Sequence, residues 1–354
     1  MNKSYILSRI GQAVAVLFIT FTVAFLLLSA LPSDAIMARF GDPALGLSAA
    51  EIEQIRQETG ADKPLLVQYV SALWGFVTGH FGISTQTGTA VSTLIASALP
   101  STVVLAGASL SLAIVLALAV SFLATLPGGG VLRSFFRGLP SFMVSLPAFF
   151  IAILLLQVFS FQLGWVRVIN PTAFEGLLLP ALTLSVPLAA PLIQVLIRSI
   201  DDVTKQSFVQ VVRARGARES WIFWRNILRN ALLPALTMAG LLFGELVSGA
   251  VVTETVFGRT GLGSLVVNAV SNRDAPVLLA VVVIAATAYV IINLIVDLLY
   301  PVVDVRLRTR AGKLQGGTHG EAGQREVVTS AAQRSVMPAV EPIGVQHPDV
   351  AGRK

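Results

Sequence analysis

The chain has 354 residues, of which 55% are hydrophobic and only 12% are charged, and its net charge is +6 at pH 7. Soluble domains carry about 25% charged residues, so this composition argues against a soluble enzyme. Cysteine is absent, which excludes disulfides and thiolate metal sites. The three histidines (His80, His319 and His347) lie too far apart in sequence to suggest a zinc motif. The first question is therefore how the chain crosses a membrane.

Six apolar stretches are long enough to cross a hydrocarbon core of about 30 Å as helices. They cover residues 10–31, 101–125, 138–161, 177–197, 232–253 and 277–299. The first stretch has no charge and is longer than the apolar core of a cleaved signal peptide, so we interpret it as a retained helix. The expected fold class is all-α, a polytopic membrane bundle of six transmembrane helices.

The positive charges predict the orientation of these helices. Most of the 25 lysines and arginines fall on the side that holds both termini, with concentrations in residues 198–229 and from Arg306 onward. Because cytoplasmic loops carry an excess of lysine and arginine, both termini are expected in the cytoplasm. The excess charge is then explained by topology, and no nucleic-acid partner is expected.

The chain divides into an N-terminal tail with the first span, an external region, a core with five spans and a C-terminal tail. The corresponding residues are 1–31, 32–100, 101–310 and 311–354. In the external region, Ser48 and Glu51 form the pattern of a capping box that opens an amphipathic helix from Ser48 to Thr59. The C-terminal tail is rich in Gly, Gln, Ser and Pro without an apolar period, which predicts disorder.

Five prolines interrupt the third and fourth expected spans. They are Pro140, Pro147, Pro180, Pro187 and Pro191. Each removes a backbone donor and bends a helix, and in lipid the freed carbonyls need internal partners or water. This favours helices that line a pathway or move, although proline is also commoner in membrane helices than in soluble ones.

The most informative segment lies between the fourth and fifth spans, at residues 198–231. Gly216 is expected to end one short helix in a left-handed conformation. Beyond it, Trp221, Trp224 and Leu228 fall at i, i+3 and i+7, which predicts one apolar stripe. Another face carries Arg218, Arg225 and Arg229. Such a helix suits docking into a groove of another protein. Two alternatives are a basic helix lying on anionic lipid and arginines that only set topology.

One acid, Glu245, lies in the middle of the fifth expected span. A charge there costs roughly 2.5–3.5 kcal/mol on insertion scales and usually faces a cavity or a partner. Two interpretations are open. Glu245 either lines a path and favours cationic or amine-bearing substrates, or it is a protonated or hydrogen-bonded acid at a subunit interface.

The segment 198–231 resembles the cytoplasmic loop of binding-protein-dependent ABC importer permeases, in the version found in dipeptide, oligopeptide, nickel and glutathione permeases. The matching runs are Phe208-Val209, Val212-Arg213-Ala214-Arg215-Gly216 and Arg229-Asn230-Ala231-Leu232-Leu233-Pro234. Shorter motifs follow the family's order at 31–34, 62–69, 79–82, 145–147, 163–165, 179–184, 253–257, 261–263, 273–276 and 293–306. The chain departs from the family's pattern at His80, where an acid is usual, and at Thr260 and Val305, where proline is usual.

This resemblance implies a type I importer permease of the bacterial inner membrane. Two homologous permease subunits, usually different ones, would form a path for di- or oligopeptides or a related small solute, and a binding protein would deliver it from outside. Two cytoplasmic ATPases would bind the loop at Arg213, Ala214, Arg215, Gly216, Trp221, Trp224, Arg229, Asn230 and Pro234. The chain would be no enzyme and bind no cofactor, with ATP held by the ATPases; it has no G-x-x-x-x-G-K-[ST] motif of its own.

Six residues are candidates for the translocation path or its external gate. They are Pro147, Glu245, Glu254, Phe257, Gly261 and Gly263. Glu254 and residues 258–263 resemble the family's external gate region, where glycines permit tight turns; a simple connecting loop is the plainer interpretation.

A self-contained channel or secondary transporter is the alternative function. Six helices with proline breaks permit it, but we find no internal repeat between the halves of the chain. A membrane anchor for a cytoplasmic complex would account for the basic loop and leave the helix breaks unexplained.

Overall fold

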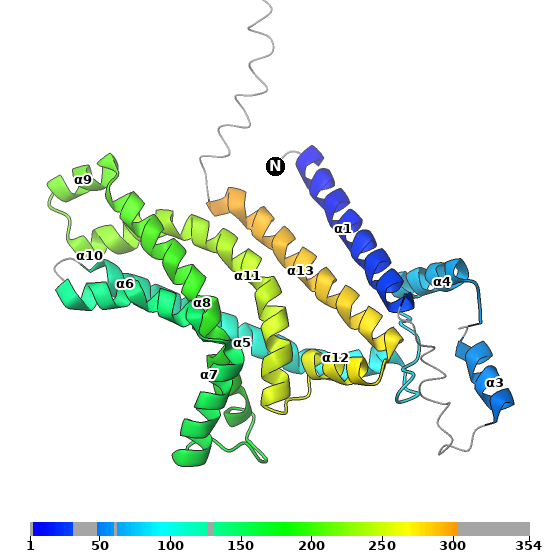
Figure 1. Cartoon of the computed structure of the whole chain (residues 1–354). Helices are drawn as coiled ribbons and strands as arrows, with labels where there is room; N and C mark the ends of the chain where they lie inside the picture. The colour runs from blue at the N-terminus through cyan, green and yellow to red at the C-terminus, as the bar shows by residue number, and fades with distance from the viewer. Residues whose placement is uncertain (1–2, 31–47, 60–61, 127–129, 304–354) are drawn as a thin grey trace, which may run out of the picture. The chain divides into compact units, whose positions relative to one another are not determined.

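A computed structural model describes residues 3–30, 48–59, 62–126 and 130–303, and most of these residues are helical (Figure 1). The tail at 311–354 and the motifs at 31–34 and 304–306 lie outside the described residues.

The expected all-helical membrane fold is confirmed. Among the described residues, five helices are long and apolar enough to cross a membrane, and a bent helix pair makes a sixth span if it counts as one. The spans are α1 (Lys3–Ser29), α5 (Val91–Thr125), α8 (Glu175–Thr204), the helix Glu219–Val256 that includes α11 (Leu228–Val256), and α13 (Ala275–Val303). The bent pair is α6 (Gly130–Ser145) with α7 (Ala148–Leu155) and the π-helix η2 (Leu156–Gln162).

The third expected span, residues 138–161, is therefore not one continuous helix. Its two parts meet at 100°. The break falls at Pro147, which takes extended backbone angles as the N-cap of α7, and proline also disfavours helical angles at the residue before it. The other four prolines lie inside α6 or α8, and α8 runs on past all three of its own as far as Thr204. Proline alone therefore does not decide where these helices break.

The second span also differs from its expected bounds. Helix α5 begins at Val91 rather than at residue 101, so the last part of the expected external region belongs to this helix. Pro100 lies inside α5.

Two shorter helices, α3 (Ala49–Thr59) and α4 (Leu65–Thr78), lie between α1 and α5 in the sequence. The predicted capping box of α3 is confirmed, since the Ser48 N–H donates to Glu51 Oε2 at 2.7 Å and the Glu51 N–H donates to Ser48 Oγ at 3.3 Å. The hydrogen bond from the Ser48 backbone lowers the pKa of the Glu51 carboxyl below its ordinary value. Helix α4 packs Tyr69 and Phe76 against Phe21 of α1.

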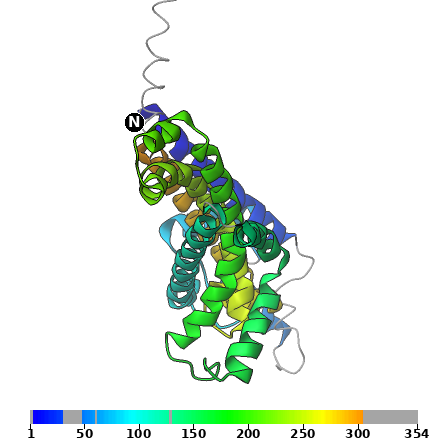
Figure 2. The same cartoon turned by 90° about the vertical axis from the view of Figure 1, so that its left-hand side faces the viewer.

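Helix α8 forms the centre of the core, in contact with α5, α6, α7 and α11 (Figures 1 and 2). Its most apolar window is 61% buried, whereas that of α1 is 11% buried. Helix α5 faces the core with small residues at four-residue spacing, Ser109, Ala113 and Ala117, all of which are buried. Small side chains allow helices in lipid to approach closely, which explains why α5 and α8 pack along so much of their length.

Candidate functional site: a helical elbow and the α11–α12 turn

Residues 205–227 form a helical elbow between α8 and α11. It contains α9 (Ser207–Ala214), α10 (Glu219–Ile222) and the π-helix η3 (Phe223–Ile227). Gly216 lies at the bend with a φ of +81°, and its N–H donates to the Arg213 carbonyl at 3.0 Å. The predicted left-handed glycine between two short helices is thus present, and a side chain there would be strained by its backbone angle.

An ion pair spans the bend of the elbow. The Arg213 Nη2 donates to Glu219 Oε2 at 2.9 Å, so the guanidinium of α9 holds the first residue of α10. Because the Glu219 carboxylate accepts this hydrogen bond, the pKa of Arg213 is raised above its ordinary value. Ala214, Arg215 and Gly216 at the tip are exposed, so the tip is open to a partner.

The expected apolar stripe of the elbow is wrong in one respect. Trp221 and Trp224 are 48% and 57% exposed, but Leu228 is buried. The π-helix η3 contains Trp224 and ends directly before Leu228, and its wider turns shift the phase of the residues that follow. Trp224 also stacks on Phe122 of α5, with ring centroids 5.9 Å apart. The inner side of the elbow is formed instead by residues that include Val209, Ile222, Ile227 and Ala231.

The remaining coupling candidates follow the elbow on the same continuous helix. Arg229 and Pro234 are exposed, and Asn230 Nδ2 donates to the Asn226 carbonyl at 2.6 Å. Pro234 lies inside α11.

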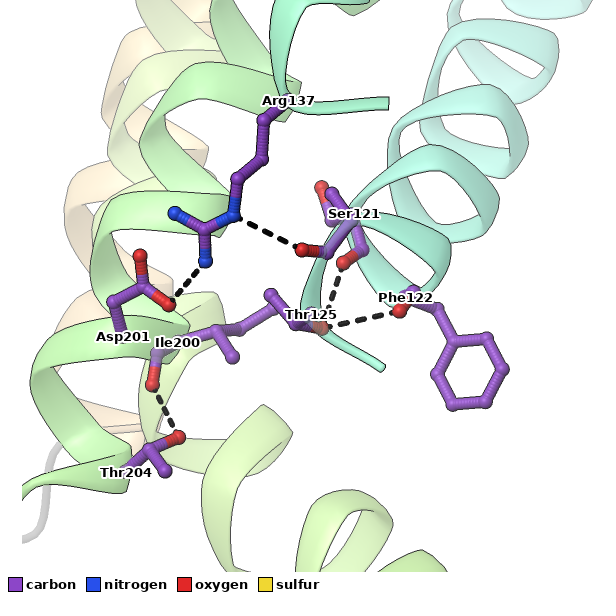
Figure 3. Close-up of polar contacts among 8 residues, drawn as sticks. Ser121, Phe122, Thr125, Arg137, Ile200, Asp201 and Thr204 are labelled. Atoms are coloured by element: carbon purple, nitrogen blue, oxygen red, sulfur yellow. Dashed lines mark hydrogen bonds and ion pairs between the residues drawn. The ribbon is translucent and has the colours of Figure 1, made fainter. Parts of the chain in front are cut away.

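Arg137 of α6 ties together the helix ends at the base of the elbow (Figure 3). Its Nη2 donates to Asp201 Oδ1 of α8 at 2.7 Å, and its Nε donates to the Ala124 carbonyl at the end of α5 at 3.1 Å. In the sequence, Arg137 lies between the second and third expected spans, where a basic residue indicates only topology. No local signal could have identified this role, because its partners come from two other helices.

Glu254 lies near the opposite end of α11, where its side chain is completely buried (0% exposed). Its carboxylate accepts hydrogen bonds from Thr102 Oγ1 of α5 at 2.6 Å and from the Gly263 N–H at 2.7 Å. The Ser264 N–H donates to the same carboxylate at 3.3 Å. Both N–H groups belong to the first turn of α12 (Leu262–Ser271), where helix N–H groups have no partner within the helix. Glu254 therefore joins three helices.

Two predicted glycines make room for this carboxylate. A side chain on Gly261 would overlap the Glu254 carboxylate, and one on Gly263 would overlap the backbone at Val251 as well. Neither glycine has a left-handed backbone, so close approach explains these two residues better than turn geometry does.

Asp274 holds the other end of α12 in a second buried network. It is 1% exposed, and its carboxylate accepts hydrogen bonds from the Ser84 hydroxyl and from the backbone N–H groups of Thr85 and Gln86. Sequence reasoning quoted Asp274 within a family motif without giving it a role. Its partners precede it by about 190 residues, which is why no local pattern could have predicted the network.

The turn between α11 and α12, residues 257–261, borders a cleft of about 280 Å³. Phe257, a predicted gate residue, lines it together with Arg167, Glu175 and Arg259. The Arg259 guanidinium donates to the Gly176 carbonyl and, at 3.2 Å, to Ser101 Oγ. The turn is thereby attached to the start of α8 and to α5.

A comparison with known families decides what this architecture is. The family described as the binding-protein-dependent transport system inner membrane component matches residues 117–309, and its N-terminal companion matches residues 2–106. The chain belongs to this family. It is the permease subunit of an ABC importer, as the resemblance in sequence implied.

Curated relatives of the permease agree. The glutathione transport system permease protein GsiC of Escherichia coli K12 is 33% identical over 305 residues, which cover 86% of this chain and 99% of that protein. A protein of Brucella suis biovar 1 that carries the name of a peptide permease is 34% identical over 315 residues, with coverage of 86% and 98%.

A solved structure of the MetNI methionine ABC transporter in an inward-facing conformation has the same fold as the permease. A chain of that structure aligns with a TM-score of 0.51 and 19% identity, over 60% of this chain and 96% of that one.

The permease separates the predicted path and gate residues into two groups. Glu254, Gly261 and Gly263 are brought together in one buried network with Thr102, and Phe257 lies nearby at the cleft. Glu245 lies on α11 as Glu254 does but is exposed, and Pro147 is exposed at the break between α6 and α7. Within the described residues, no group of three His, Asp or Glu side chains is placed to hold a metal ion.

Proposed function

We propose that the permease pairs with a second, homologous but different subunit, and that the two enclose the path of an ATP-driven importer. The imported solute is a di- or oligopeptide or a related solute such as glutathione. The names of its relatives support this substrate class. A binding protein outside the cell delivers the solute, and separate ATPases hydrolyse ATP, so this chain is not an enzyme and binds no cofactor.

The ATPases dock on the exposed tip of the elbow, and the observation that carries this proposal is the helix Glu219–Val256. It begins at the elbow and ends two residues after Glu254, so one continuous helix connects the docking surface to the α11–α12 turn. A displacement of the elbow would therefore be transmitted to the turn, which serves as part of the external gate. This couples two distant sites through one rigid element.

The elbow is tested by Gly216→Pro, because proline holds φ near −65° while Gly216 has +81°. We expect normal membrane insertion, but ATP hydrolysis no longer coupled to uptake in the complete importer. Gly107→Ala is the matched control, since nothing lies within 4 Å of an added side chain there. Normal uptake by the Gly216→Pro variant would contradict the docking assignment.

The orientation, with both termini in the cytoplasm, has its own test. The chain has no cysteine, so Arg215→Cys in the elbow and Asn272→Cys after α12 each introduce a single exposed thiol. A thiol reagent that does not cross the membrane should label Asn272→Cys in intact spheroplasts and label Arg215→Cys only after lysis. The reverse pattern would show the opposite orientation.

A further inference from the structure

Helix α11 has two faces of different chemistry. One face is buried in the core and is almost entirely apolar, with Ala235, Leu242, Leu246 and Ala250. The other face is exposed on the single chain and is mixed in character. It consists of Thr237, Leu241, Gly244, Glu245, Ser248 and Val252, whose spacing keeps them on one side of the helix. We call this set the α11 outer face.

The α11 outer face does not have the composition of a surface covered by lipid. Between Val14 and Leu27 of α1, every exposed side chain is apolar, as expected of a helix that faces hydrocarbon. On α11 the corresponding surface carries a carboxylate, two hydroxyls and a glycine. Glu245 lies eleven residues before the end of α11 at Val256, a rise of roughly 16 Å along the helix axis. A charge at that depth usually faces a cavity or a partner rather than lipid.

The three acids Glu245, Glu254 and Asp274 also differ in their partners. The last two are buried and accept several hydrogen bonds each. The Glu245 carboxylate accepts none from the described residues, and the hydroxyl of Ser248 is turned to the backbone carbonyls of Gly244 and Glu245. No described residue therefore satisfies the Glu245 carboxylate, which is left open to water, to a substrate or to a partner subunit.

We propose that the α11 outer face lines the translocation path and that Glu245 makes the path selective for substrates with a positive charge, such as peptides that contain lysine or arginine. Gly244 beside it leaves space for a passing side chain, because only the Tyr289 ring lies near the position of an added Cβ. The hydroxyl oxygens of Thr237 and Ser248 accept hydrogen bonds from water in the path, so the carboxylate stays hydrated until a cation passes. This inference rests on the proposed import of peptides.

The experiment measures uptake by the complete importer, reconstituted with its second permease subunit, ATPases and binding protein. Three dipeptides are compared, Ala-Lys, Ala-Ala and Ala-Glu. For Glu245→Gln we expect the ratio of Ala-Lys to Ala-Ala uptake to fall by about tenfold, which corresponds to about 1.4 kcal/mol. Because the binding protein is the same in each preparation, any change in the ratio arises in the permease.

Two further variants serve as controls. Glu245→Asp keeps the charge and should keep the preference for Ala-Lys. Ser111→Ala removes an exposed hydroxyl of α5, outside the α11 outer face, that donates to a backbone carbonyl of its own helix as Ser248 does; its ratio should equal that of the unaltered permease.

Each other outcome overturns the inference in a distinguishable way. An unchanged ratio with normal uptake in Glu245→Gln shows that Glu245 does not select charge. Loss of the second permease subunit during co-purification of this variant places Glu245 at the subunit interface instead of in the path. If the unaltered importer takes up none of the three dipeptides, the peptide substrate itself is wrong, and the inference fails with it.

Discussion

The two ends of the helix Glu219–Val256 are built in different ways. At the elbow, the bend depends on one left-handed glycine, an apolar cluster beneath it and an ion pair that is about half exposed. At the α11–α12 turn, the Glu254 carboxylate is fully buried and accepts hydrogen bonds from Thr102 and from two N–H groups of α12. The difference shows where substitutions act on partners and where they act on the fold: an exposed tip is free to bind another protein, whereas a buried carboxylate leaves unpaired donors when it is removed.

The largest effect is expected for Glu254→Ala. It leaves Thr102 Oγ1 and two N–H groups of α12 without their acceptor, and each unpaired buried donor costs about 1–3 kcal/mol. We expect the midpoint of thermal unfolding in detergent to fall by roughly 5–10 °C, measured by fluorescence-detected size-exclusion chromatography. Glu245→Ala, on the same helix, is the matched control and should shift the midpoint little. Equal shifts of the midpoint for both variants would mean that the hydrogen bonds of Glu254 do not stabilise the fold.

A smaller loss is expected for Gly263→Ala. The added methyl group would overlap the backbone at Val251, and overpacking of this kind costs typically about 1–3 kcal/mol. The same thermal measurement tests it, with Gly244→Ala as a control because an added Cβ there would be in ordinary contact with Tyr289. A stability equal to that of the control would show that α12 shifts freely, and that its close approach to α11 is not required.

Asp274→Asn should have a smaller effect again. The amide keeps the shape and one acceptor oxygen but weakens the charge-assisted hydrogen bonds to Ser84, Thr85 and Gln86. We expect a loss of about 1 kcal/mol and faster proteolysis at the segment before α5. A larger loss than for Glu254→Ala would reverse the order of importance proposed for the two carboxylates.

The smallest effect on stability is expected at the elbow, for Arg213→Ala and Glu219→Ala. Their side chains are 46% and 52% exposed, and pairs of this kind contribute about 0–1 kcal/mol. A double-mutant cycle on thermal stability should therefore give a coupling energy below about 1 kcal/mol, while ATPase binding, measured by co-purification, weakens in both single variants. A coupling energy of several kcal/mol would mean that the Arg213–Glu219 pair stabilises the fold as strongly as the buried network at the α11–α12 turn does.

Several features of the fold could be predicted because their causes are local. An apolar run of sufficient length forms a spanning helix wherever it lies, the Ser48–Glu51 capping box needs only residues three apart, and Gly216 was recognisable from its place between two short helical patterns. The break of the third span was not predicted, since five prolines had similar local signals and only Pro147 interrupts the helix. The apolar stripe on Trp221, Trp224 and Leu228 was partly wrong because a regular period was assumed across what is a π-helix.

The sequence by itself determined the class of the protein: length, hydropathy and a few ordered motifs were enough for a membrane permease, because each of these signals is carried by neighbouring residues. The tertiary structure alone decided what its acids do. In the sequence, nothing local to Glu254, Asp274 or Glu245 shows which of these carboxylates is buried. The first two meet donors from α5 and from the segment before it, more than 150 residues away. Glu245 meets none in the described chain, since it is exposed on the side of α11 that faces away from the core.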